Sequence, residues 1–151
     1  MSIKEITELY GINDFSIEEI THNQDNIPEE YHDNIIPTLC ILQKIRNSIR
    51  QPIQICSTYR NPEYNKKAGG AKRSLHLVFN AIDFYPLGFN SFSLNKLFSQ
   101  IADGKFDCEI NFKGKAVGVS HKVMGLGLYK RFIHIDTRGI LGRRAPAKWN
   151  G

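Results

Sequence analysis

The sequence has little of what marks a secreted, disulfide-stapled or membrane-bound protein. Its 151 residues include three cysteines, none of them in a Cys-x-x-Cys pair, so neither a disulfide framework nor a zinc ribbon is indicated. No apolar run approaches the ~20 residues that span a bilayer, and acidic residues stand near the N-terminus where a signal peptide would be hydrophobic. We therefore expect cytoplasmic synthesis without a signal peptide, and no membrane insertion.

The chain also shows no internal repeat, low-complexity tract or domain linker. Its hydrophobic content of 41% is enough for one core, so we expect a single domain over residues 1–151, with residues 1–13 as an N-terminal extension. The net charge of +5 favours an anionic partner such as nucleic acid, a membrane surface or a cell wall. Nucleic acid is not expected, because no recognition-helix or base-stacking motif is present.

Hydrophobic periodicity predicts an α+β fold, in which helices flank a small, mostly antiparallel sheet. Helices are expected over residues 1–11, 16–20, 28–49 and 91–102, and Pro37 should kink or divide the third of these. Strands are expected over residues 53–57, 81–85, 106–112, 124–129 and 132–136. The basic connection at residues 113–123 is interpreted as a hairpin beside the functional site, and residues 142–149 as a basic tail.

A carboxylate interrupts the apolar strand at residues 81–85. Asp83 lies between Ile82 and Phe84, and a buried carboxylate is costly unless it is paired, hydrogen-bonded or bound to a metal. In the last expected strand, period-two alternation puts His134 and Asp136 on one face. Asp83 must therefore meet a partner.

Two histidines are candidates for that partner. If the two strands lie side by side, Asp83 and His134 would meet, and His76 would join them from the loop that enters the first strand. Two imidazoles and one carboxylate form a three-ligand zinc set that leaves a fourth position open, as catalytic zinc sites do. The alternative is that these are ordinary polar residues near a sheet edge.

Several motifs in order resemble those of the zinc D-Ala-D-Ala carboxypeptidases and the related phage endolysins, which cleave peptidoglycan stem peptides. The motifs are the Ser-Thr-Tyr-Arg-Asn-Pro run at residues 57–62, Gly-Gly-Ala at 69–71, Ser74-x-His76, Ala81-x-Asp83, Gly-x-Gly-x-Tyr at 125–129 and Phe-x-His-x-Asp at 132–136. The similarity covers residues 15–149.

The resemblance implies a zinc site and a substrate pocket. It implies that His76, Asp83 and His134 ligate zinc, which agrees with the reasoning from the residues themselves. It further implies that Arg60 holds a substrate carboxylate or the developing oxyanion, and that Ser74 and Tyr59 belong to the substrate pocket. The alternative for Arg60 is a surface arginine that follows a strand.

The chain departs from the family pattern at two positions. Phe79 stands where relatives usually have glycine, so either the turn is made differently or the pocket floor is filled. Arg131 stands where some relatives carry an acidic general base, and Asp136 is then the candidate base. The alternative for Asp136 is a carboxylate that orients a ligand imidazole. His121 is weighed as a residue of the pocket mouth against a solvated loop histidine.

Taken together, these features predict a monomeric zinc peptidase that hydrolyses peptide bonds of peptidoglycan stem peptides, as a carboxypeptidase or an endopeptidase. A phage-type lysis role is favoured, in which the protein acts on the cell wall after release through a membrane pore or as a virion component. One alternative is a catalytically inactive, wall-binding homologue. Another is a small nucleic-acid-binding domain.

Overall fold

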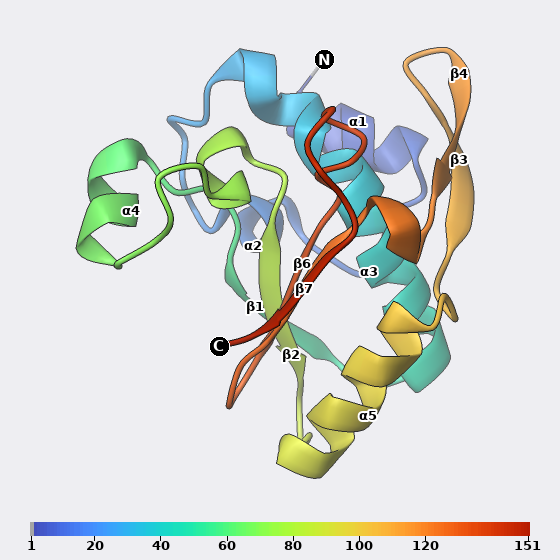
Figure 1. The fold of residues 1–151 in the computed structure, drawn as a ribbon. Helices are drawn as coiled ribbons and strands as arrows, with labels where there is room; N and C mark the ends of the chain where they lie inside the picture. Colours follow the sequence, from blue (N-terminus) through green and yellow to red (C-terminus); the bar gives the residue numbers. More distant parts are fainter. Residues whose placement is uncertain (1) are drawn as a thin grey trace.

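A computed structural model describes residues 2–151 and shows an α+β fold built on a five-stranded sheet (Figure 1). The strands lie in the order β1-β2-β6-β5-β7, with bounds Ile53–Ser57, Ile82–Pro86, Ile133–Asp136, Gly125–Leu128 and Ala147–Asn150. All neighbours pair antiparallel except β5 and β7, which are parallel. The predicted fold class and the mostly antiparallel sheet are confirmed. The sequence pattern did not predict β7, which lies in the expected basic tail.

Two long helices cover one side of this sheet. α3 (Ile36–Ile49) and α5 (Ser91–Ala102) lie to the right of the sheet in Figure 1, and their apolar residues are buried in a core shared with β2 and β6. Pro37 stands in the first turn of α3, and a 3₁₀ helix, η1 (Glu29–Ile35), precedes it. Proline thus divides the expected helix, because it lacks an amide hydrogen for the preceding turn.

Three short helices begin at residues whose side chains cap them. α1 (Ile3–Leu9) and α2 (Ile17–Thr21) start after Ser2 and Ser16, and both serines form capping boxes with a glutamate three residues later. α4 (Pro62–Lys67) starts after Asn61, whose side chain accepts a hydrogen bond from the Tyr64 amide.

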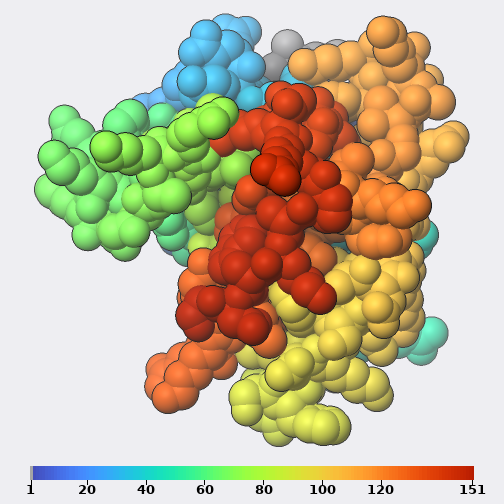
Figure 2. Space-filling view, viewed as in Figure 1, coloured from blue at the N-terminus to red at the C-terminus, as the bar shows by residue number. Residues whose placement is uncertain are grey.

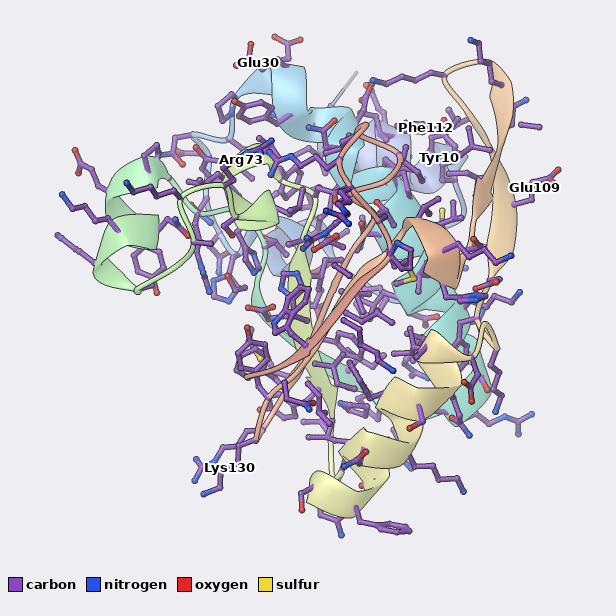
Figure 3. All side chains as sticks on the ribbon, in the orientation of Figure 1. Tyr10, Glu30, Arg73, Glu109, Phe112 and Lys130 are labelled. Atoms are coloured by element: carbon purple, nitrogen blue, oxygen red, sulfur yellow. The ribbon has the colours of Figure 1, made fainter. Side chains whose placement is uncertain are left out.

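A separate two-stranded sheet consists of β3 (Cys108–Phe112) and β4 (Lys115–Val119). Its Phe112 packs against Tyr10, with ring centroids 6.3 Å apart (Figure 3). The hairpin lies on the α3 side of the molecule, across the main sheet from α4 (Figure 1). The expected hairpin is therefore present, but it does not lie beside the site described below.

Candidate metal centre

The two central strands of the sheet bring a carboxylate and an imidazole together. β2 and β6 pair so that Asp83 lies directly opposite His134, and Asp83 Oδ1 is 2.9 Å from His134 Nδ1. Both side chains are buried. The sequence separation between them is 51 residues, so it is the strand pairing that creates this contact.

A second imidazole reaches the same carboxylate from a short 3₁₀ helix, η2 (Leu75–Val78). The Ser74 side chain caps this helix, and the carbonyl of Thr58 fixes the His76 ring through Nδ1 at 2.6 Å. This leaves His76 Nε2 facing Asp83 Oδ2 at 3.1 Å, buried and without a hydrogen bond. A buried polar nitrogen without a partner is uncommon and is expected where a ligand belongs.

The turn from η2 into β2 depends on Phe79, which stands where relatives usually have glycine. Phe79 has φ 57° and ψ 45°, the left-handed conformation that glycine adopts without strain. Its side chain is fully buried in the hydrophobic core and does not line the cavity. The turn therefore keeps the conformation that glycine would give it, and burial of the phenyl ring offsets the strain.

The three side chains fit a metal ion. Ligand atoms from His76, Asp83 and His134 all lie within 4.8 Å of one another. Two nitrogens and one carboxylate oxygen form the donor set of catalytic zinc sites, and the unpartnered His76 Nε2 faces into the group. Thr58 and Asp136 bond the other nitrogen of each imidazole, which is the usual way to orient a histidine that ligates a metal.

Charges around Asp83 keep it ionised. Burial alone would raise the pKa of Asp83, but the hydrogen bond from His134 and the close approach of His76 outweigh it and hold the pKa well below its ordinary value. The guanidinium of Arg60 adds a positive charge, with Nη2 3.5 Å from Asp83 Oδ2. The carboxylate is thus ready to bind a cation at neutral pH.

Asp136 lies on the opposite side of the His134 ring from Asp83. It is fully buried and accepts five hydrogen bonds: from the Gly125 amide, from the amide, Nε and Nη2 of Arg138, and from His134 Nε2 at 2.8 Å. A Cβ atom at Gly125 would lie 2.5 Å from Arg138 Nε, so the ion pair of Asp136 and Arg138 occupies space that glycine leaves open. These contacts favour the orienting role of Asp136 over the general-base role.

The two carboxylates also set the protonation of His134. Burial alone would lower the pKa of His134, but the hydrogen bonds that its ring donates to Asp136 and Asp83 outweigh it and raise the pKa to about 9. Without a metal, the ring is therefore an imidazolium at neutral pH that donates from both nitrogens. Asp136 holds the Nε2 proton, so Nδ1 is the nitrogen that would lose its proton on binding a cation beside Asp83.

A cavity of about 780 Å³ opens over this centre. The predicted residues Arg60, Ser74, His76, Asp83 and His134 line it, together with aromatic and basic residues of the last strands. The molecular surface is hollowed below the green lobe that carries α4, beside the red C-terminal segment (Figure 2). The centre thus lies at the base of an open, substrate-sized cavity.

Two other predicted candidates lie elsewhere. Tyr59 packs in the core and lines a separate cavity of about 300 Å³, because successive residues of the extended segment after β1 face opposite sides and Arg60 takes the side toward the metal centre. His121 bonds Asp107 through Nδ1 at 2.9 Å and does not line the large cavity. His121 is thus not a residue of the pocket mouth, and it is not a solvated loop histidine either, because it begins a 3₁₀ helix, η3 (His121–Val123), and is paired with Asp107.

In a comparison with known protein families, the profile of the peptidase M15 family matches residues 13–136. The chain belongs to the peptidase M15 family. M15 peptidases are metal-dependent, typically with zinc, so this M15 chain is a metallopeptidase by family and carries a fitting His-Asp-His group. Searches of curated proteins and of solved structures found no match.

The family match ends at Asp136, yet residues beyond it complete the M15 cavity. Arg138 lies over the Trp149 ring at 5.2 Å, and the same ring lies 5.2 Å from His134. Trp149 Nε1 also donates to the Tyr129 hydroxyl at 3.0 Å. Sequence reasoning missed Arg138 and Trp149, and an arginine two residues after the His-x-Asp motif was the available signal.

A buried hydrogen-bond network behind the centre was also missed. Thr38 of α3 donates to the carbonyl of Asn80 and contacts the hydroxyl of Thr137, both within 2.9 Å. Asn80 in turn accepts from the Thr137 amide and donates to the Asn34 carbonyl. The network ties α3 to the start of β2 and the end of β6, so it fixes the two strands that carry Asp83 and His134.

Proposed function

We propose that this M15 chain is a zinc-dependent peptidase that hydrolyses peptide bonds of peptidoglycan stem peptides, with His76, Asp83 and His134 as the metal ligands. One observation carries the proposal. The buried, unpartnered Nε2 of His76 converges with Asp83 and with Nδ1 of His134 at the base of an open cavity. An ion pair that served only stability would align this nitrogen to hydrogen-bond the Asp83 carboxylate, whose Oδ2 is only 3.1 Å away.

Bound in this group, zinc would supply a Lewis acid and lower the pKa of a bound water toward neutrality. Arg60 binds the oxygen of the scissile group, because its half-buried guanidinium lies beside Asp83 and its charge is permanent. Ser74 lines the cavity and provides a hydroxyl for the peptide.

Asp136 acts through His134 in this proposal, since all of its observed contacts are with His134, Gly125 and Arg138. Arg131, at the position where some relatives carry an acidic base, is exposed and does not line the cavity. That arginine is the observation that supports the alternative, an inactive wall-binding homologue.

A phage-type lysis role and a monomeric state complete the proposal. They rest on the resemblance of the motifs and on the compact cavity formed within one chain. No helix within residues 2–151 is long and apolar enough to cross a bilayer.

The test is mass spectrometry of purified muropeptides incubated with the protein, with a chelator and with zinc added back. We expect a chelator-sensitive product whose mass identifies the bond that is cut. His76→Ala should lose both bound zinc and product, whereas His121→Ala, a matched histidine outside the cavity, should keep both. Chelator-resistant turnover would rule out the metal mechanism. Tight muropeptide binding without any product would support the inactive homologue.

A further inference from the structure

The rim of the cavity carries more positive charge than the metal centre uses. Five arginines line the cavity: Arg60, Arg73, Arg138, Arg143 and Arg144. Asp83 is the one carboxylate that lines it. Arg60 pairs with Asp83 and Arg138 with Asp136. Within residues 2–151, the other three arginines form no ion pair with a carboxylate.

These three arginines come from two walls of the cavity. Arg73 lies in the loop between α4 and η2, and Arg143 and Arg144 lie in the loop before β7, 70 residues along the chain from Arg73 to Arg143. Nη1 of Arg143 donates to the backbone carbonyl of Arg73, so the two walls are joined at this point. Figure 3 labels Arg73 on the green loop beside the red C-terminal segment.

The arrangement crowds like charges. Partial burial and the neighbouring charges of Arg73 and Arg138 lower the pKa of Arg143, which shows that these cations repel one another. A bound anion would relieve this repulsion. The hydrogen bond from Arg143 uses a backbone carbonyl, so the charge of that guanidinium is not neutralised.

We propose that Arg73, Arg143 and Arg144 form a second anion subsite, which binds a free carboxylate of the substrate away from the scissile bond. The proposal rests on the proposed function and deepens it, because it selects among stem peptides. Peptides whose acidic side groups are free carboxylates bind, and peptides in which the same groups are amidated bind poorly. Guanidinium groups suit this task because their donors match the geometry of a carboxylate.

The subsite is separate from the metal centre. Arg60 adjoins Asp83, whereas the three rim arginines lie on the loops that form the cavity mouth. Arg143 and Arg144 also lie beyond residue 136, where the family match ends. Two of the three arginines of the subsite therefore lie outside the part of the chain that the family profile covers.

The experiment compares two synthetic stem peptides that are identical except that the acidic side groups are free in one and amidated in the other. For the wild-type zinc enzyme, we expect kcat/KM to be about tenfold higher for the acid peptide, the effect of one charge-assisted hydrogen bond. The double variant Arg143→Gln/Arg144→Gln should lose this preference, so that its kcat/KM falls about tenfold more for the acid peptide than for the amidated one. Arg143→Lys/Arg144→Lys should retain part of the preference.

Arg50→Gln is the matched control, since it removes one exposed arginine far from the cavity lining and should preserve the preference. Measurable turnover of the amidated peptide shows that the double variant folds. Equal wild-type turnover of both peptides would overturn the subsite, as would a preference that survives in the double variant.

Failure of the proposed function gives a different result. If the wild-type protein cleaves neither peptide, hydrolysis is refuted, and the subsite is judged by isothermal titration of both peptides into His76→Ala. Tighter binding of the acid peptide, lost when Arg143→Gln/Arg144→Gln is added, would support the subsite. Equal affinity for the two peptides would overturn it.

Discussion

Replacing Asp136 with asparagine tests how the structure prepares His134 for metal binding. Asp136 accepts five hydrogen bonds, and its Oδ2 receives two of them, from His134 Nε2 and from Arg138 Nη2, both at 2.8 Å. Asparagine can present only one oxygen. If that oxygen keeps the backbone amides of Gly125 and Arg138, its NH₂ group faces His134 Nε2, which must then accept a hydrogen bond.

The consequence is a change of tautomer. A neutral His134 that accepts at Nε2 carries its proton on Nδ1, the nitrogen that faces Asp83 and would ligate zinc. Loss of such an orienting carboxylate costs about 10–100-fold in metal affinity, or about 1.4–2.7 kcal/mol. We therefore expect Asp136→Asn to bind zinc about 10–100-fold more weakly, measured by competition with a chromophoric chelator.

The matched control is Asp107→Asn, because Asp107 also accepts a hydrogen bond from a histidine, His121, but lies outside the cavity. Its zinc affinity should equal that of the wild type. Activity at saturating zinc separates the two roles of Asp136. An orienting role predicts recovery, whereas a general base predicts a loss of about 10²–10⁴-fold that zinc does not restore. Unchanged zinc affinity in Asp136→Asn would refute the reasoning.

Two further predictions concern stability. Phe79→Ala should destabilise the fold by about 3–5 kcal/mol, because the core loses the phenyl ring. Phe79→Gly should be about 1 kcal/mol more stable than Phe79→Ala, because residue 79 has φ 57°, which glycine adopts without strain. The reverse order of stability in denaturant unfolding would contradict the left-handed turn. Burial raises the pKa of the Cys40 thiol to about 12 in the folded protein. As the pH rises, the thiol of the unfolded chain therefore ionises before that of the folded chain. The stability that Cys40 contributes below pH 9 is lost as the pH rises toward 12. Between pH 8 and pH 10, wild-type protein should lose about 1.4 kcal/mol more unfolding free energy than Cys40→Ala; equal losses would argue against a buried, protonated thiol.

The sequence was sufficient to predict the centre where local patterns determine it. Alternation in β6 predicted that His134 and Asp136 share a face, and the isolated charge of Asp83 in an apolar strand required a partner, which is how the pairing of β2 with β6 was inferred. Apolar residues that recur with the helical period of 3.6 predicted α3 and α5, because each helix buries one face.

Elements fixed by distant contacts were not predictable. β7 pairs in parallel with β5 within a basic segment that contains Pro146, so neither composition nor alternation indicates a strand. Tyr59 was assigned to the pocket by resemblance, but the extended backbone turns it away from Arg60 and into the core. The partners of Asp136 depend on how closely the backbone at Gly125 approaches Arg138, which no local pattern reveals.

The direct pairing of Asp83 with His134 has a consequence for refolding. A slip of β6 by one residue would place an isoleucine opposite Asp83 and turn His134 to the other face. Such a chain would retain most of its helical circular dichroism, yet the three proposed ligands would no longer converge. Zinc uptake by refolded protein therefore reports the alignment of the two central strands, and a stoichiometry below one ion per chain would measure the misaligned fraction.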